Sequence, residues 1–265
     1  MMRLLSVLFI SLFLQSFPAH ANNDRDNPKQ VHAPWGYPKD ANENDNYIIE
    51  RKQYVISYNP KLNVPNWVAW QLNAKWYGDT PRKSGKFITD TTLPAGFERI
   101  VHDDYTRSGY DRGHVVRSEE RTANEEDNRS TFLMTNVFPQ TPTLNQQTWL
   151  SLEYECERLC KAEGKELFVL AGGIYPKQPQ RLNGKVAVPD SCWKIVIVLE
   201  KGQTPKEINR STTVIAVIMN NGKYDKSNNV WTKHTTTIDA IEQSTGYDVL
   251  RDLPDALEEH LESKK

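Results

Sequence analysis

Apolar side chains recur along this chain at the spacings of both strands and helices. Residues 67–76 alternate in the way that predicts a half-buried strand. Its apolar face would carry Val68, Trp70, Leu72, Ala74 and Trp76. Short β-branched or apolar runs at residues 166–170, 193–199 and 213–219 predict buried central strands.

Helical spacing of apolar residues occurs in three segments. The longest covers residues 145–163 and is predicted to end at Gly164, and shorter helices are predicted at residues 238–244 and 254–262. Residues 77–96 contain prolines and glycines that predict a long irregular loop. Because strands and helices do not alternate regularly, we predict an α+β fold with a mainly antiparallel central sheet flanked by helices.

The first residues have the pattern of an export signal. Arg3 precedes an uncharged run from Leu4 to Leu14, and Ala19-His20-Ala21 matches a signal-peptidase site. We therefore expect residues 1–21 to be a signal peptide, with an uncleaved anchor as the alternative. The mature protein would be secreted or periplasmic, with no membrane contact after cleavage, because no later segment is long and apolar enough to span a bilayer.

The rest of the chain is expected to form one domain, because no Pro/Gly/Ser-rich linker divides it. Residues 22–46 are rich in Asn, Asp, Pro and Lys and are expected to be a flexible lead-in, with order beginning near Tyr47. The domain is placed at residues 47–252, followed by a C-terminal helical tail at residues 253–265.

The balanced overall charge excludes attraction of polyanions by a net positive charge of the whole protein. The 265 residues include 33 Lys and Arg against 34 Asp and Glu, so there is no global basic field for nucleic acid or membranes. Any polyanion would have to be bound by specific local groups.

The three cysteines, Cys156, Cys160 and Cys192, permit at most one intrachain disulfide. A bridge to Cys192 and three buried thiols are both open. A zinc site is disfavoured, because no second thiol pair or closely spaced histidines accompany them.

The segment Asp111-Arg112-Gly113-His114 gathers an acid, a guanidinium, a flexible glycine and an imidazole in four residues. Asn136, Asn145 and Glu153 follow at intervals downstream. Further blocks are Asn66-Trp67-Val68-Ala69-Trp70-Gln71-Leu72, Leu93-Pro94-Ala95-Gly96, Phe132-Leu133-Met134-Thr135-Asn136, Pro139-Gln140-Thr141-Pro142 and Thr245-Gly246-Tyr247.

This arrangement resembles the DNA/RNA non-specific endonucleases, the ββα-metal nucleases that include endonuclease G. Their signature is DRGH, followed some thirty residues later by a metal-binding asparagine that opens a helix. The resemblance extends from about Tyr47 to Leu250, and motif and blocks in this order are highly specific. It implies a ββα-metal active-site motif.

His114 is the candidate general base, because an imidazole with an ordinary pKa of about 6.5 is largely neutral near pH 7. Taken alone, it could equally be a histidine satisfied inside a hairpin. Asn145 is the candidate metal ligand, because its carbonyl oxygen is a hard donor suited to Mg²⁺. The competing role of Asn145 is a helix N-cap, and the two roles are compatible.

Glu153 lies eight residues after Asn145, which in an α-helix places both on the same side. It could hydrogen-bond a water of the metal's hydration shell, or be an ordinary exposed glutamate. The resemblance implies that Arg112 and a second arginine bind phosphate. Arg82 takes the second position if one gap is allowed, with Lys83 as the fallback.

The resemblance further implies that Asp111 holds the motif in place and that Asn136 supports the site. One departure from the family pattern is Arg117, where many relatives carry proline. Arg117, Arg121 and Arg129 could form a local basic rim for the phosphate backbone, or belong to a solvated face with the interleaved acids.

The sequence therefore favours an exported, sugar-non-specific endonuclease that depends on Mg²⁺, with Mn²⁺ able to substitute. Its substrates would be single- or double-stranded DNA and RNA, and by resemblance its products are 5′-phosphorylated fragments. The alternatives are a secreted nucleic-acid-binding protein with a dead site and a hydrolase of another phosphodiester. The preference between DNA and RNA, the oligomeric state and an inhibitor protein stay open.

Overall fold

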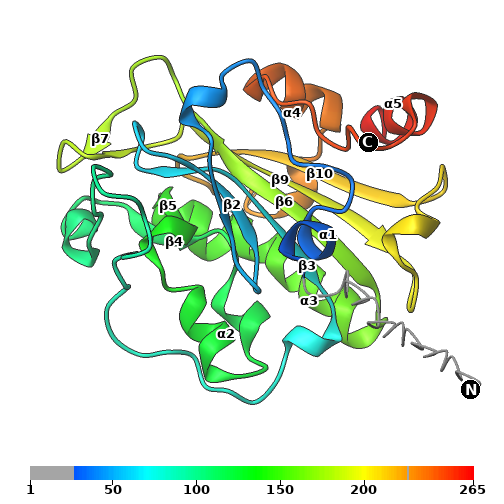
Figure 1. Ribbon diagram of the computed structural model, residues 1–265, viewed down its shortest axis with the longest axis horizontal. Helices are drawn as coiled ribbons and strands as arrows, with labels where there is room; N and C mark the ends of the chain where they lie inside the picture. The colour runs from blue at the N-terminus through cyan, green and yellow to red at the C-terminus, as the bar shows by residue number, and fades with distance from the viewer. Residues whose placement is uncertain (1–26, 226) are drawn as a thin grey trace, which may run out of the picture.

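The computed structural model describes residues 27–225 and 227–265, so the segment predicted to be the signal peptide lies outside it (Figure 1). Its centre is a six-stranded antiparallel sheet with strand order β1-β2-β3-β6-β9-β10. The strands are β1 (Tyr47–Glu50), β2 (Val55–Asn59), β3 (Val64–Leu72), β6 (Glu166–Ile174), β9 (Ser191–Leu199) and β10 (Thr213–Asn220). The predicted α+β fold with an antiparallel sheet is confirmed. The three strands predicted to be buried and central are present, but only β6 and β9 are central, because β10 is a partly buried strand at the edge of the sheet.

The sheet is buried on both faces. In β3, Val68, Trp70 and Leu72 belong to one apolar layer, whereas Trp67 and Ala69 belong to the other. The prediction of a half-buried strand is therefore wrong, because helices and loops cover the second face as well. The strand also ends at Leu72, because the Asn73 side chain accepts a hydrogen bond from the Lys75 amide and starts a 3₁₀ turn.

The first face of the sheet carries the DRGH segment. A two-stranded ribbon of β4 (Asp111–His114) and β5 (Val137–Gln140) lies there with α2 (Glu125–Ser130) and α3 (Leu150–Ala162) (Figure 1). A π-helical turn, η7 (Leu144–Trp149), leads directly into α3. The predicted helix is thus present, and Gly164 follows it in the left-handed conformation with φ of 67°.

The opposite face is covered by α1 (Pro28–His32), α4 (Ile238–Thr245) and α5 (Asp255–Glu262) (Figure 1). The expectation that residues 22–46 are flexible is wrong for residues 27–46. Asn27 caps α1, and Trp35 is buried with its Nε1 donating to the Pro205 carbonyl at 3.2 Å. The polar composition concealed these few apolar anchors. The C-terminal helix packs in the same layer, through buried Leu261.

The remaining elements are short. They are β7 (Arg181–Leu182), β8 (Val186–Ala187) and the 3₁₀ turns η2 (Glu43–Asp45), η3 (Ala74–Trp76), η4 (His102–Tyr105), η5 (Ser118–Arg121), η6 (Met134–Asn136), η8 (Pro205–Glu207) and η9 (Trp231–Lys233). Residues 77–96 form the predicted irregular loop, joined to the active-site face by a parallel bridge between Ile88 and Leu133.

The cysteines are all free and buried, so the bridge to Cys192 is not formed. Burial raises the pKa of the Cys156 and Cys192 thiols to about 12, which leaves them protonated. Within the described part of the chain, no helix has the length and apolar character needed to cross a membrane.

Candidate active site

The DRGH residues form one strand of the β4-β5 ribbon. Asp111 pairs with Gln140 and His114 with Val137. Because side chains alternate along a strand, Asp111 and Gly113 point to one side and Arg112 and His114 to the other. The Gly113 position was expected to provide flexibility, but its role is different. A Cβ there would lie 2.1 Å from Oε1 of Gln140, so only glycine lets the ribbon close.

His114 lies in an aromatic slot. Its ring centroid is 4.8 Å from that of Phe87 and 4.9 Å from that of Phe132, which meets it edge-on. The ring is partly exposed, but Nε2 is enclosed and has no hydrogen-bond partner among the described residues. The alternative of a histidine satisfied inside a hairpin therefore does not describe it.

Burial, followed by the nearby charges of Arg82 and Arg117, lowers the pKa of His114 to about 3. All three causes disfavour the imidazolium form. The ring is therefore neutral near pH 7 and can accept a proton.

The backbone after His114 is fixed by Asn136. This fully buried side chain donates to the carbonyls of Val116 and Thr131 at 3.0 and 2.9 Å, and its Oδ1 accepts from the Val116 amide at 3.0 Å. All three bonds hold main chain, so Asn136 supports the site as expected.

Asn145 is tied to the same ribbon by Asp111. Its Nδ2 donates to Oδ2 of Asp111 at 2.8 Å, and Nε2 of Gln146 donates to the same oxygen at 2.8 Å. Because an ionised carboxylate only accepts, the amide nitrogen of Asn145 faces it and Oδ1 is turned away. Asn145 is not the N-cap, a position that Thr143 occupies.

Arg112 is anchored by the backbone. Its Nε and Nη2 donate to the His102 carbonyl at 3.0 and 2.7 Å, and Nη2 also donates to Oγ1 of Thr106 at 3.0 Å. Its guanidinium lies over the Tyr105 ring. The expected two-donor fork is thus largely occupied by protein. Asp111 and Arg112 help to line an open pocket of about 470 Å³.

Arg82 and Lys83 both lie close to Phe132, one of the two aromatic side chains that form the slot. The Arg82 guanidinium and the Lys83 ammonium are 5.4 and 5.3 Å from the centre of the Phe132 ring. Lys83 donates from Nζ to the carbonyls of Ser84 and Lys86 at 2.9 and 3.0 Å. Arg82 donates from Nε to Oγ of Ser118 at 3.1 Å, the same nitrogen lies 3.8 Å from Oε1 of Glu119, and the Arg82 side chain is 56% exposed. Its two terminal nitrogens make no hydrogen bond to the described residues.

Glu153 is buried rather than exposed, which excludes the ordinary surface glutamate. Its Oε2 is 3.6 Å from Nε of Arg117 and its Oε1 is 3.9 Å from Nζ of Lys194, and it accepts no hydrogen bond from the described residues. Burial raises its pKa to about 7, against the opposing charges of Lys194 and Arg117. The rotation expected between Asn145 and Glu153 assumed an α-helix, but the first turn is π-helical.

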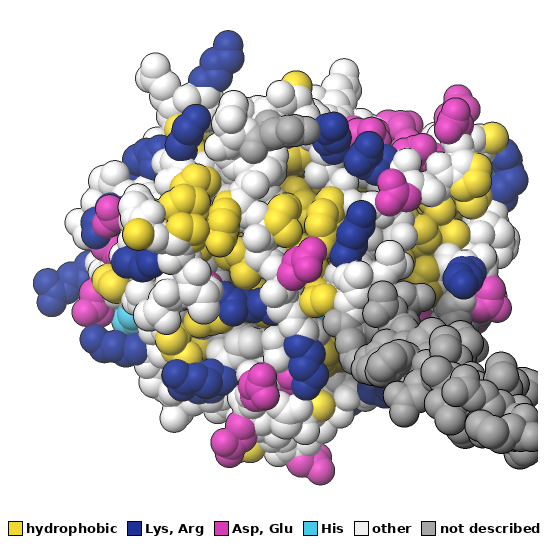
Figure 2. All heavy atoms as spheres, in the orientation of Figure 1, with side chains coloured by type: hydrophobic (Ala, Val, Ile, Leu, Met, Phe, Trp, Pro, Cys, Tyr) yellow, Lys and Arg dark blue, Asp and Glu magenta, His cyan; other side chains and the backbone are white. Residues whose placement is uncertain are grey.

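The three arginines Arg117, Arg121 and Arg129 form neither the possible basic rim nor one solvated face, because only Arg129 is exposed. Arg121 is fully buried, with its guanidinium 4.1 Å from the centre of the Trp76 ring and donating to the Gln53 carbonyl. Arg117 pairs with the carboxylates of Glu119, Glu153 and Glu157. Figure 2 shows Lys and Arg side chains spread over the visible face with Asp and Glu between them, rather than gathered in one patch.

Three contributors to the site were not identified from sequence. Lys194 is 1% exposed and lies over Trp149 at 4.1 Å, and a lone lysine inside the apolar run of β9 was a usable signal. Phe87 and Phe132 form the slot around His114, but nothing in their sequence surroundings separates them from core phenylalanines.

Comparison with known proteins identifies the class. A family model described as DNA/RNA non-specific endonuclease matches residues 33–256. The chain is 44% identical over 241 residues to "Nuclease" of Nostoc sp., covering 88% of this chain and 85% of that protein. The chain therefore belongs to the DNA/RNA non-specific endonuclease family, whose members are metal-dependent nucleases.

More distant likenesses agree with this assignment. Human mitochondrial endonuclease G is 29% identical over 167 residues, covering 58% of this chain and 56% of that protein. A solved structure of endonuclease G with the inhibitor EndoGI has the same fold. It matches with a TM-score of 0.72 and 22% identity, over 88% of this chain and 94% of that one.

Proposed function

We propose that this protein is an exported, Mg²⁺-dependent endonuclease that hydrolyses DNA and RNA to 5′-phosphorylated fragments, with Mn²⁺ able to replace Mg²⁺. The observation that carries the proposal is the anchoring of Asn145 to Asp111, three residues from His114 on one strand.

His114 acts as the general base. Because Nε2 is enclosed, Nδ1 on the exposed part of the ring accepts the proton of the attacking water. The aromatic slot fixes the ring plane, and the charges of Arg82 and Arg117 keep the ring neutral until the proton arrives.

The residues around Asn145 fit a Mg²⁺ ion. Oδ1 is a hard oxygen turned away from the Asp111 carboxylate that holds the amide nitrogen, and Asp111 also lines a pocket that is open to solvent. When bound, the ion supplies positive charge that stabilises the phosphoryl oxygens and the departing 3′ oxygen. Asp111 holds the Asn145 amide so that Oδ1 stays available.

Arg82 donates its terminal nitrogens to the phosphate, and Arg112 contributes positive charge from the wall of the open pocket. Glu153, held between Arg117 and Lys194, orients water near the leaving group. These groups contact phosphate and solvent rather than base edges, which accounts for cleavage without sequence preference.

The export pattern at residues 1–21 supports a secreted or periplasmic location. N-terminal sequencing of protein collected from the medium or periplasm should begin at Asn22; a chain that keeps residues 1–21 would refute cleavage. The likeness to an endonuclease G bound by an inhibitor supports a search for a protein inhibitor of this enzyme.

The proposed reaction is tested by incubating supercoiled plasmid and ribosomal RNA with the protein, with MgCl₂ or with EDTA. Both substrates should be degraded only with metal, and the fragments should accept a kinase label only after phosphatase treatment. Binding without cleavage would favour the dead-site alternative. Turnover of a small aryl phosphodiester with no action on nucleic acids would favour the other hydrolase.

A further inference from the structure

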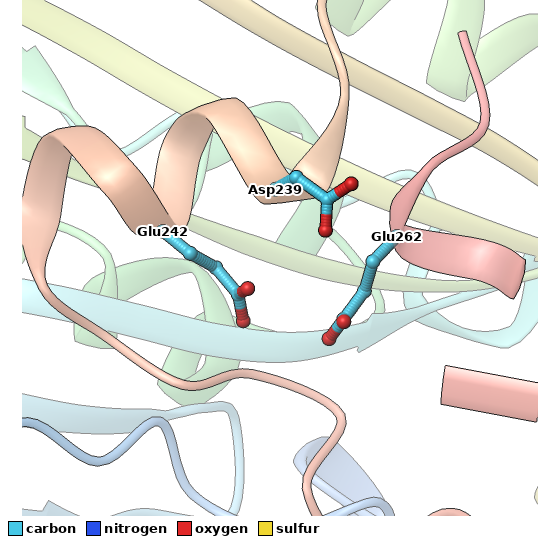
Figure 3. A group of neighbouring side chains, drawn as sticks. All are labelled: Asp239, Glu242 and Glu262. Carbon is cyan, nitrogen blue, oxygen red and sulfur yellow. The ribbon is translucent and has the colours of Figure 1, made fainter. Parts of the chain in front are cut away.

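Three carboxylates meet on the face of the sheet opposite to the DRGH ribbon. Asp239 and Glu242 lie three residues apart on one side of α4, and Glu262 is the last residue of α5. Figure 3 shows the three side chains pointing into the same gap between the helices. One oxygen from each lies within 4.8 Å of the others.

This charge is not balanced by protein groups. Glu262 is only 8% exposed, yet its Oε1 is enclosed and accepts no hydrogen bond from any described residue. Among residues 27–225 and 227–265, the only hydrogen-bond donor to the group is the Val249 amide, which reaches Oε1 of Glu242 at 2.8 Å.

The surroundings add negative charge. After burial, the strongest influences on the pKa of Glu262 come from the acids Glu242, Glu258, Asp239 and Asp248. The cation Arg251 acts on Glu258 and lies 4.0 Å from Asp248, outside the three carboxylates. Lys264 follows on the chain but donates its ammonium to the carbonyls of Arg210 and Thr212. A buried carboxylate with an unpaired oxygen is costly, and several acids around it raise that cost.

We propose that Asp239, Glu242 and Glu262 bind a divalent cation, with Ca²⁺ preferred to Mg²⁺. Ca²⁺ accepts six to eight oxygen ligands in irregular geometry, so three carboxylates from two helices suit it, with water completing the shell. Mg²⁺ requires a near-octahedral arrangement and gives up its water reluctantly. The negative end of the α5 dipole, where Glu262 lies, adds to the attraction.

This ion is separate from the one proposed at Asn145, which lies on the other face of the sheet. By joining the last turn of α5 to α4, it holds the C-terminal helix against the domain. Ca²⁺ would therefore stabilise the folded protein without taking part in cleavage.

The experiment uses the Asn145→Ala protein, in which binding of the active-site ion is weakened, and CaCl₂ alone as the probe. Calorimetric titration at pH 8.5 should show one Ca²⁺ bound. An excess of about 100-fold over the dissociation constant should raise Tm by about 5 °C. MgCl₂ should bind at least about tenfold more weakly.

Glu262→Gln in this background should weaken Ca²⁺ binding by at least about tenfold. Glu259→Gln is the matched control, because it removes the same charge from an exposed site on α5. Absence of Ca²⁺ binding, or equal binding in both variants, would overturn the proposal. The competing explanation is a proton shared within the group, since burial among acids raises the pKa of Glu262 to about 8. It predicts stabilisation on lowering the pH and none by Ca²⁺.

Glu262→Gln in the otherwise unchanged protein should cleave plasmid in MgCl₂ at the parent rate. Failure of the Ca²⁺ site is therefore distinguishable from failure of the proposed nuclease function, which would appear in the parent protein.

Discussion

Two histidines on opposite sides of the sheet, buried His32 and partly exposed His114, have similar pKa shifts and different surroundings. Burial lowers the pKa of both His32 and His114 to about 3. His32 has both nitrogens bonded, since Nε2 donates to the Lys52 carbonyl at 2.8 Å and Nδ1 accepts from the Gln71 amide at 3.0 Å. Nε2 of His114 has no partner. A lowered pKa therefore marks burial, whereas unused bonding capacity distinguishes the catalytic candidate.

The same contrast separates other pairs of like residues. Both the oxygen and the nitrogen of the Asn136 amide are hydrogen-bonded to main chain, whereas Oδ1 of Asn145 accepts no hydrogen bond from the described residues. Lys83 is held by two carbonyls, whereas Arg82 keeps its terminal donors.

The acids of the active-site face divide in the same way. Buried Glu120 accepts from Nε1 of Trp70 at 2.9 Å, whereas Glu153 accepts no hydrogen bond from the described residues. In each pair we expect the satisfied member to contribute to stability and the open member to activity.

The largest difference in activity is expected between the variants of the two histidines. His114→Ala should lower kcat by roughly 10²–10⁴-fold, the usual contribution of a general base, with little change in Tm. His32→Ala should cost about 1–3 kcal/mol of stability, because it leaves a buried amide and carbonyl unpaired. Its folded fraction should keep near-parent kcat. Plasmid-cleavage kinetics and thermal unfolding of both variants test this, and an active His114→Ala would remove the residue from the mechanism.

The asparagines give the next largest effect. Asn145→Ala should lower activity by roughly 10–100-fold at low Mg²⁺, and higher Mg²⁺ should restore part of it, because the ion is held mostly through water. Asn136→Ala should lower Tm and leave the Mg²⁺ dependence unchanged. Titration of the cleavage rate with MgCl₂ compares them. A metal defect in Glu153→Ala with none in Asn145→Ala would reassign the ligand.

The Arg82 and Lys83 variants should differ less in activity than the asparagine variants do. Arg82→Ala should reduce kcat/KM by about tenfold on both DNA and RNA, the worth of one charged hydrogen bond to phosphate. Lys83→Ala should stay within about threefold of the parent, since its ammonium is committed to the loop. If Lys83→Ala alone is impaired, the phosphate contact belongs to the lysine and the contrast fails for this pair.

The sequence located the candidate site residues better than it predicted the side chains that surround them. DRGH, Asn145 and Glu153 could be located because they belong to a motif that is read directly along the chain. The apolar runs of β6, β9 and β10 predicted the strands of the sheet. The slot of Phe87 and Phe132 could not be predicted, because it joins two loops by tertiary contact. The same holds for the charges flanking Glu153, which come from a loop and from β9.

Local signals also misled where tertiary packing outweighed them. The polar composition of residues 27–46 predicted flexibility, yet a few apolar side chains dock this segment on the sheet. Arg121 lies among acidic residues in the sequence, which suggested a surface position, but it is buried in the fold.

The smallest expected effect concerns the pH dependence of the acidic pair. His114, with its pKa near 3, stays neutral above about pH 5, so its titration does not change kcat/KM in that range. Glu153 must be ionised to orient water, and its pKa is raised to about 7, so kcat/KM should fall as pH drops through 7. Glu153→Gln should lower the rate and flatten the profile between about pH 5.5 and 8.

Glu120→Gln is the matched control. Its charge is one of the causes that raise the pKa of Glu153, so removing it should keep the limb but move it to lower pH, by less than about one unit. Lys194→Met should move the limb the opposite way, because the lysine lowers that pKa. Profiles of kcat/KM at saturating Mg²⁺ measure all three variants. A limb near pH 7 that survives in Glu153→Gln would assign the titration to another group and end the distinction between Glu153 and Glu120.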